Sequence, residues 1–479
     1  MVSDTHFNMT RQELYRILTD SFGFIPTEGQ RTVLYHLSAF LLSEKPSPTY
    51  LLRGYAGTGK TTMVTTLVKT LPLLGMSYQL MAPTGRAAKV LSGYTGKTAS
   101  TIHRKIYRFQ QYADGSLRMT RAENKAKNTV FIVDECSMIP DDFSNGRSLL
   151  DDLINYVFSG ENCRLLLIGD NAQLPPVGLE ISPANDINVL KNSFGLTVAS
   201  FELTEVMRQE EESGILYNAT ALRNVETFHE TSLQLPLFTT NGFSDVHRIE
   251  PQEFEELLWQ NFNGKNSNEA VIICRSNNRA NMYNQAIRAR ILQEEGEIST
   301  GDKLMVVKNN YFWTDEEQKI SFIANGDMIE LMRINNTEEM YGFHFADVEI
   351  QLTDYQEEPN LSVKILLETL KSDSPALTQE ESDRLHKAVE EDYMDIPNKR
   401  DRYKAMRQNP YFNALQVKFG YALTCHKTQG GQWPTVFLDA PFVPDDKELQ
   451  ISDLRWFYTA VTRAQRQLYF VNFKNEYFF

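Results

Sequence analysis

Residues 48–71, which read "PTYLLRGYAGTGKTTMVTTLVKTL", decide the fold class. A short apolar run leads into a glycine-rich loop, and residues with helical spacing follow. The loop, Gly54 to Thr61, fits the pattern G-x-x-x-x-G-K-[ST], in which backbone N–H groups wrap phosphates. Lys60 is expected to reach the β/γ-phosphates, and Thr61 to offer its hydroxyl to Mg²⁺. The predicted nucleotide-binding set is Gly54, Gly57, Thr58, Gly59, Lys60, Thr61 and Thr62.

Other short apolar runs in the chain end in small or polar residues, as buried parallel strands do. "YQLMAPTG", "TVFIVDE" and "CRLLLIGD" follow the glycine loop, and functional loops gather at the carboxyl ends of such strands. A second set comprises "AVIICRS", "DKLMVV", "GDMIELM", "FGYALT" and "TVFLDA", then a helix and the closing strand "QLYFVNF". The sequence therefore predicts an α/β protein with two parallel-sheet units.

Two acids end the strand "VFIVDE", and they supply the partners that a phosphate loop needs. Asp134 is predicted to hold Mg²⁺, and Glu135 to orient or deprotonate the attacking water. Gln173, in "LIGDNAQLPPVG", is placed to sense the γ-phosphate. Arg208 in "LTEVMRQ" and Arg463 in "WFYTAVTRA" are candidates to stabilise transition-state charge, although single arginines often serve only as surface ion-pair residues. Hydrolysis of a nucleoside triphosphate is the predicted chemistry.

The overall composition is that of a globular protein of several domains. The chain has 479 residues, of which 42% are hydrophobic and 23% charged. No apolar run reaches the roughly 20 residues that cross a bilayer. The four cysteines are isolated, with no C-x-x-C pair, so the sequence suggests neither a zinc site nor disulfides. A reducing, cytoplasmic location is expected.

The net charge of −14 argues against a polyanion partner, but residues 86–127 carry ten Lys/Arg and only two acids. This window contains "YRFQQYADGSLRMTR", residues 107–121, where Asp114-Gly115 is a strong signal for a two-residue hairpin turn. Tyr112 is expected opposite Leu117. Such a basic ribbon is either a solvated face or a surface that contacts a polyanion.

Two further segments stand outside the α/β units. Thr10 and Glu13 form a capping-box pattern ahead of a short amphipathic helix, which predicts a packing role for residues 1–24. Residues 333–413 begin with the alternating run "INNTEEMYGFHFADVEIQLTD" and continue into the charged helical run "TQEESDRLHKAVEEDYMD". We interpret 333–413 as an insertion in the second unit.

The order of the motifs resembles that of superfamily-one DNA helicases of the RecD/Dda type. The resemblance runs from about Thr27 to the C-terminus. The matching pieces are "TEGQ", "GYAGTGKT", "APTGRAAKVL", "STIH", "VDECSM", "GDNAQLPPVG", "LTEVMRQ", "NNY…ANGD" and "ALTCHKTQGG…YTAVTRA". Each piece is modest support alone, whereas nine in this order are highly specific. Gln432 departs from the pattern, because many relatives carry Glu there.

The resemblance implies two RecA-like domains with ATP between them. They would span residues 25–225, with a hairpin insertion at 104–128, and residues 226–332 plus 414–479, with an SH3-like insertion at 333–413. Gln30 would read adenine. Single-stranded DNA would contact Thr84, Arg86, Lys89, Thr101 and His103 in the first domain and Thr424, His426 and Lys427 in the second. The hairpin falls where the family places a pin that splits duplex DNA, so Phe109 and Tyr112 would stack on the last base pair.

The predicted function is an ATP- and Mg²⁺-dependent DNA helicase that moves 5′→3′ on single-stranded DNA, with this polarity implied by the resemblance alone. Its predicted partners are single-stranded DNA and junctions of single- and double-stranded DNA, with other replication or repair proteins as further candidates. It is expected to be active as a monomer and to have no membrane partner. Two alternatives stay open: an RNA helicase or protein-stripping translocase, and a DNA-binding subunit of a repair complex whose ATPase regulates assembly.

Overall fold

The computed structural model describes residues 9–111, 117–140, 148–206, 213–227, 236–264, 269–314, 322–353, 355, 359–442 and 449–479. Only the backbone is described for 109–111, 117–119 and 224–227. The described chain forms two compact units. Residues 9–83, 87–108, 120–140 and 148–206 form the first unit. The described residues from Ser213 onward form the second, together with Thr84–Arg86 and the described part of 109–119.

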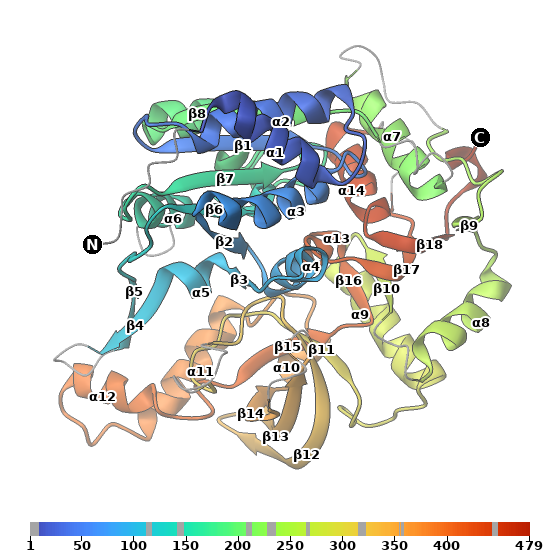
Figure 1. Cartoon of the computed structure of the whole chain (residues 1–479). Coiled ribbons are helices and arrows are strands. Elements are labelled where there is room, and N and C mark those ends of the chain that lie inside the picture. Colours follow the sequence, from blue (N-terminus) through green and yellow to red (C-terminus); the bar gives the residue numbers. More distant parts are fainter. Residues whose placement is uncertain are drawn as a thin grey trace. The chain divides into compact units, whose positions relative to one another are not determined.

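A six-stranded parallel sheet is the centre of the first unit, in the order β3-β2-β6-β7-β1-β8 (Figure 1). Its middle strands β6 and β7 are buried along their whole length and mostly apolar, as expected for a sheet covered on both faces. The strands are β1 Pro48–Gly54, β2 Ser77–Ala82, β3 Ala99–Thr101, β6 Thr129–Val133, β7 Arg164–Gly169 and β8 Thr197–Leu203. The helices are α1 Arg11–Phe22, α2 Glu28–Leu41, α3 Lys60–Thr70, α4 Gly85–Thr95, α5 Ile102–Ile106 and α6 Leu149–Phe158.

The N-terminal helix α1 packs as predicted. Thr10 and Glu13 make both hydrogen bonds of a capping box. Leu14, Leu18 and Phe22 are buried in the core that the helix shares with α2 and α3. Helix α1 is therefore part of the first unit.

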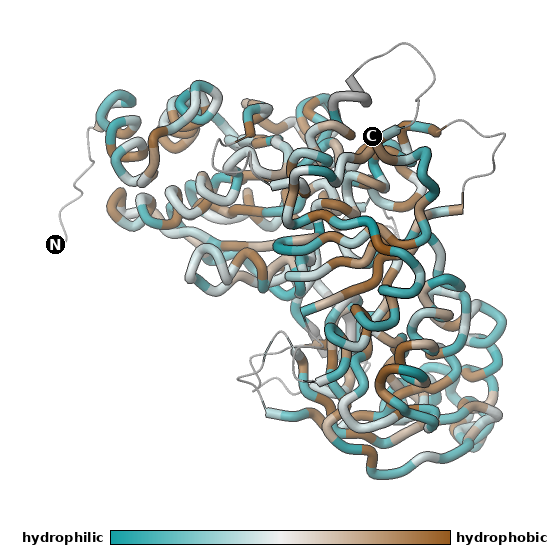
Figure 2. The backbone as a smooth tube through the Cα atoms, turned by 90° about the vertical axis from the view of Figure 1, so that its right-hand side faces the viewer, coloured by the Kyte–Doolittle hydropathy of each residue, from teal (hydrophilic) through white to brown (hydrophobic). Residues whose placement is uncertain are grey.

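The second unit contains a five-stranded parallel sheet in the order β16-β10-β17-β18-β9. Its strands are β9 Val246–Arg248, β10 Ala270–Cys274, β16 Ala422–Thr424, β17 Trp433–Asp439 and β18 Ala464–Val471. Its helices are α7 Gly214–Thr227, α8 Pro251–Phe262, α9 Asn277–Ala286, α13 Cys425–Thr428 and α14 Ile451–Val461. Helix α7 packs on α14, so the second unit begins earlier than the expected boundary at 225/226. Figure 2 shows long hydrophobic stretches along the sheet strands, whereas the helices alternate between the two colours.

A closed barrel of five strands also belongs to the second unit, which confirms the predicted SH3-like insertion in kind. The strands are β11 Lys303–Val306, β12 Met328–Met340, β13 Phe343–Leu352, β14 Leu361–Leu366 and β15 Leu415–Phe419. The barrel therefore begins before and ends after the expected range 333–413. The prediction that "DKLMVV" and "GDMIELM" lie in the parallel sheet was wrong, because these runs form β11 and β12, which pair antiparallel in the barrel.

The charged helical run packs on the barrel. Helices α10 Glu368–Lys371, α11 Gln379–Glu391 and α12 Lys399–Met406 connect β14 to β15. Leu385, Val389 and Met406 form one apolar cluster with Phe343 and Phe345 of β13. The charged helical run thus has a buried apolar side.

The predicted hairpin is present as β4 Tyr107–Gln111 and β5 Leu117–Arg121, which form a two-stranded sheet. Its turn and Tyr112 lie outside the described residues. Among the helices that the structure describes, none has the length and apolar character needed to cross a lipid bilayer. All four cysteines lie in described segments and are free and buried.

Candidate nucleotide and nucleic-acid sites

The glycine loop turns sharply between β1 and α3. Gly57 and Gly59 have φ of 75° and 88°, in the left-handed region that favours glycine. At Gly59 a Cβ would also lie 2.5 Å from Nε2 of Gln30, so a side chain there would be strained and would displace the amide that bonds the Thr58 carbonyl. The loop therefore presents bare backbone at the amino end of α3, where N–H groups attract phosphate.

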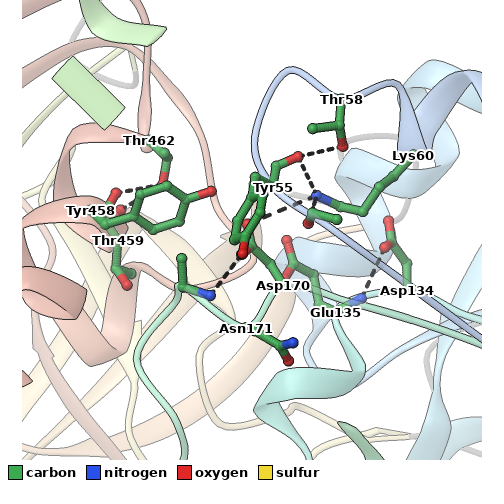
Figure 3. Close-up of polar contacts among 12 residues, drawn as sticks. Tyr55, Thr58, Lys60, Asp134, Glu135, Asp170, Asn171, Tyr458, Thr459 and Thr462 are labelled. Carbon is green, nitrogen blue, oxygen red and sulfur yellow. Dashed lines mark hydrogen bonds and ion pairs between the residues drawn. The ribbon is translucent and has the colours of Figure 1, made fainter. Parts of the chain in front are cut away.

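Lys60 is held over this loop by acceptors of its own unit (Figure 3). Its Nζ donates hydrogen bonds to the carbonyl oxygens of Gly54, at 2.6 Å, and Tyr55, at 2.9 Å. The Oδ2 atom of Asp170 lies 3.9 Å from the same nitrogen. Asp170 is 2% exposed and was missed in the sequence, although an acid that ends a strand beside a phosphate loop is a signal that could have found it.

Strand order brings the acids to the loop. β7 lies between β6 and β1, and the register pairs Arg53 with Gly169 and Val133 with Leu167. Asp134 directly follows β6, and Asp170 directly follows β7. Because the strands are parallel, both carboxylates emerge at the edge of the sheet where β1 enters the glycine loop.

The two adjacent acids differ in backbone conformation. Glu135 has φ of 54°, a left-handed conformation that costs a non-glycine residue about 1–3 kcal/mol and gathers at functional sites. Its N–H donates to Oδ1 of Asp134 at 2.9 Å, and the hydroxyl of Tyr94 donates to Oδ2 of the same carboxylate. Sequence reasoning missed Tyr94, because nothing in the pattern of α4 shows that its hydroxyl reaches another strand.

The chemistry of Thr61 and Asp134 fits a magnesium ion that arrives with a nucleotide. Thr61 is exposed in the first turn of α3 and offers a hydroxyl, and Asp134 offers a carboxylate. Magnesium prefers oxygen ligands and is usually held by one or two carboxylates together with substrate phosphates and water. Within the described ranges no group of three or more His, Cys, Asp or Glu could hold a metal unaided. The donors present are those of a metal–nucleotide site.

Two glutamines were predicted to contact the nucleotide. Gln30 is fully buried; its Oε1 accepts from the Thr27 N–H at 3.0 Å, and its Nε2 donates to the Thr58 carbonyl at 3.1 Å. It braces the glycine loop here, and its contact with adenine stays a prediction. Gln173 is 6% exposed, and its Oε1 has no hydrogen-bond partner in the described structure. A buried carbonyl oxygen of this kind needs a donor, such as an attacking water molecule.

The two predicted arginines differ in what the structure describes. Arg208 lies outside the described residues. Arg463 is 3% exposed in the second unit. Its guanidinium donates to the carbonyl oxygens of Thr459 and Gly431, at 2.9 and 3.1 Å, and to the Thr462 hydroxyl at 3.1 Å. Thr459 and Thr462 are drawn in Figure 3. These bonds use three of the five N–H donors of the guanidinium, and its contact with a phosphate stays a prediction.

The predicted strand contacts of the first unit are partly structural. Thr101 is 4% exposed, and its hydroxyl caps α5 by accepting from the Arg104 N–H at 3.2 Å. Burial lowers the pKa of His103, whose ring lies 5.6 Å from that of Tyr107. Lys89 is exposed on α4.

Other predicted contacts lie elsewhere. Thr84 and Arg86 group with the second unit, and the Arg86 guanidinium lies 3.6 Å from the ring centroid of Trp433 in that unit. Phe109 is described only as backbone in β4. Tyr112 is outside the described residues.

Lys427 has a buried ammonium group in the second unit. It lies in α13, which follows β16 after Thr424, with His426 exposed beside it. No atom in the described structure forms a hydrogen bond with its Nζ. Burial, and then the charge of Lys418, lowers the pKa of Lys427 to about 8. Lys418 lines the same hollow, with Asn277 and other residues of α9. A buried cation without a partner is costly, and an anion would relieve that cost.

Comparison with known proteins gives relatives for both units. Residues 28–233 match a family model described as an AAA domain, and residues 419–471 match one described as a UvrD-like helicase C-terminal domain. The chain is 28% identical over 293 residues to the ATP-dependent RecD2 DNA helicase of Deinococcus radiodurans, covering 60% of this chain and 36% of the relative. It is 33% identical over 204 residues to the ATP-dependent DNA helicase dda of Enterobacteria phage T4, covering 41% and 42%. Each match spans less than half of the relative's length.

One solved structure shows the scale of the likeness in three dimensions. It is a Pif1 helicase structure, described as giving the structural basis for DNA unwinding at forked double-stranded DNA by two coordinating Pif1 helicases. The alignment covers 95% of this chain and 94% of the other chain. Its TM-score is 0.49, at 16% identity.

Proposed function

We propose that this chain, which is related to the superfamily-one helicases of the RecD/Dda type, is an ATP-dependent DNA helicase that moves 5′→3′ along single-stranded DNA and unwinds duplex DNA. The observation that carries the proposal is the polar edge of the first sheet. There a glycine loop with its lysine lies beside the carboxylates that end β6 and β7. A second unit of RecA-like topology and the matched helicase C-terminal domain support a motor rather than a lone ATPase domain.

Each part of the nucleotide edge has a proposed task. The loop N–H groups and Lys60 bind the phosphates, and Glu135 orients or deprotonates the attacking water. Gln173 positions that water, and Arg463 stabilises the charge that develops in transfer. Mg²⁺, held by Thr61 and Asp134, would neutralise phosphate charge when bound. The RecD2 and dda names both specify ATP dependence, which supports ATP as the nucleotide.

Lys427 is the strongest support for a strand-binding surface in the second unit. Its ammonium has no partner in the described structure, and phosphate is the anion that a DNA backbone supplies at each step. Thr424 and His426 adjoin it on the same short segment. We propose that these residues hold the strand in the second unit and that Lys89, Thr101 and His103 hold it in the first.

The test is unwinding of duplexes with a 5′ or a 3′ single-stranded tail by the purified chain. We expect ATP-dependent unwinding of the 5′-tailed duplex only. Unwinding of the 3′-tailed duplex would reverse the polarity. ATPase stimulated by single strands without unwinding of either duplex would indicate a translocase, and preference for RNA tails an RNA helicase. DNA binding without turnover would indicate a regulatory subunit.

We propose that the β4–β5 hairpin acts as the pin that separates the strands. Stacking of a base on an aromatic side chain is worth about 1–3 kcal/mol, comparable with the roughly 1.4 kcal/mol of a stacking step in duplex DNA. Replacing Phe109 and Tyr112 by Ala should therefore reduce unwinding sharply and leave DNA-stimulated ATPase near normal. A variant that unwinds at the parent rate would make the hairpin a surface ribbon, and loss of ATPase as well would make it a structural brace.

A further inference from the structure

Tyr94 makes a contact that the proposed chemistry does not yet use. It lies near the carboxyl end of α4, and its hydroxyl donates to Oδ2 of Asp134, the carboxylate proposed to hold Mg²⁺. The other oxygen of that carboxylate accepts the Glu135 N–H at 2.9 Å. Each oxygen of Asp134 thus has one fixed donor. Two donors on opposite oxygens define the rotation of a carboxylate about its own axis.

The Tyr94 hydroxyl is the donor in this contact, because an ionised carboxylate can only accept. A carboxylate oxygen has more than one lone pair. Asp134 can therefore keep both hydrogen bonds and still offer lone pairs to a metal ion.

The position of Tyr94 is fixed by packing. Leu91, one turn earlier on α4, is fully buried in the core of the first unit, and Tyr94 packs against that core. The Thr95 hydroxyl donates to the Leu91 carbonyl at 2.7 Å, at the end of the helix. Tyr94 and Thr61 also line one hollow of about 160 Å³ beside α3. The ring therefore borders the place where the second proposed ligand offers its hydroxyl.

We propose that Tyr94 is a positioning residue that holds the Asp134 carboxylate in the orientation needed for the metal–nucleotide complex. The inference rests on the proposed function, because it assumes that Asp134 binds Mg²⁺ together with a nucleotide. Removing a residue that hydrogen-bonds a metal ligand typically lowers metal affinity or activity by about 10–100-fold. Tyr94 lies on α4, the helix that also carries Lys89, a proposed contact of single-stranded DNA.

The test is binding of a non-hydrolysable ATP analogue to the full chain by calorimetry at a series of Mg²⁺ concentrations. Tyr94→Phe keeps the ring. The Mg²⁺ concentration that gives half of the increase in affinity for the analogue should rise by about 10-fold, and the affinity for the analogue without Mg²⁺ should be unchanged. Tyr107→Phe is the matched control. It removes a hydrogen bond of the same chemistry in the same unit, from the Tyr107 hydroxyl to Oδ2 of Asp152 at 2.8 Å. Its Mg²⁺ midpoint should not move.

A double-mutant cycle separates positioning from mere packing. In an Asp134→Asn background, Tyr94→Phe should produce no further shift in the Mg²⁺ midpoint, because the group that it orients is gone. An unchanged midpoint in the single variant would overturn the inference, and so would a lowered one, which would mean that the hydroxyl competes with the metal. If Tyr94→Phe does not fold, Tyr94→Met provides the same measurement. Failure of the parent chain to bind the analogue more tightly with Mg²⁺ would instead count against the proposed function.

Discussion

Lys60 in the first unit and Lys427 in the second are both proposed to bind phosphate, yet they are held in opposite ways. Lys60 donates to two loop carbonyls and lies near Asp170, so its charge has acceptors before any ligand arrives. Lys427 has none in the described structure, and burial lowers its pKa to about 8. A group that must stay in place through a chemical cycle has built-in acceptors, whereas a group that takes and releases a strand leaves its acceptor position to the strand.

The largest expected effect is at Lys60. Lys60→Ala removes the cation over the phosphate loop, so ATP hydrolysis should be abolished, while affinity for single-stranded DNA stays near that of the parent. Steady-state ATPase assays and fluorescence anisotropy with a labelled oligonucleotide measure the two quantities. Full turnover by the variant would remove the basis of the mechanism. Equal loss of DNA affinity would break the division of labour between the two lysines.

The next largest effect is expected for Glu135→Gln, which tests whether Glu135 orients or deprotonates the attacking water. The amide keeps the shape of the side chain but cannot take a proton, so hydrolysis should fall by several orders of magnitude while ATP still binds. Asp134→Asn is the comparison, because it should also weaken the Mg²⁺ dependence of binding. Single-turnover hydrolysis and nucleotide binding measure both variants. The same mild defect in the two would show that the roles are wrongly assigned.

How far the sequence predicted this structure depended on how local each signal was. The strand, glycine loop and helix from β1 to α3 and the capping box of α1 were predicted correctly, because each is set by residues within a few positions of one another. The runs that form β11 and β12 were placed in the wrong sheet, because a short apolar run does not encode its partner strand.

The site was predicted in its motifs and missed in its long-range contacts. Asp170 and Tyr94 were not predicted, because each contacts a residue that is distant in the sequence. Asp170 lies near Lys60, and Tyr94 donates a hydrogen bond to Asp134. Lys427 was placed by resemblance alone. Its buried ammonium, which has no hydrogen-bond partner among the described residues, follows from packing around α13 and could not be seen in the residue order.

The third prediction concerns Lys427, whose replacement should stabilise the free protein but weaken its binding of single-stranded DNA. Lys427→Met removes a buried cation, so the free protein should become more stable at pH 7 by on the order of 1–3 kcal/mol. The same change should weaken single-strand binding by roughly 10-fold, because one charge-assisted hydrogen bond is lost. Thermal melting and anisotropy measure the two effects. Lys364→Met is the matched control. Lys364 is 4% exposed in the second unit, and its Nζ donates to Oε1 of Glu338 at 2.6 Å, so its removal should destabilise the protein instead.

The pH dependence of Lys427 follows from its lowered pKa. Below about pH 8 the folded and unfolded chains both carry the proton, and the cost of the buried charge is present in full. Between about 8 and the usual 10.5 the folded chain loses the proton first, so the parent gains stability relative to Lys427→Met. Affinity of the parent for DNA should fall over the same range and approach that of the variant. Parallel pH profiles of parent and variant would contradict the assignment.

The smallest expected effect is at Lys89, and it tests whether the first unit touches the strand at all. Lys89 is exposed on α4, and a lysine in water gains little from one phosphate beyond the release of counterions. Lys89→Ala should therefore weaken binding only a few-fold, alike for all sequences, and lower the slope of log affinity against log salt by about 0.7. Lys45→Ala is the matched control, because Lys45 is also exposed, lies ahead of β1 and has no predicted contact. A salt slope that is the same in both variants would place the strand away from α4. Lys427 would then be the one proposed lysine contact of the strand that remains, which would sharpen the contrast with Lys60.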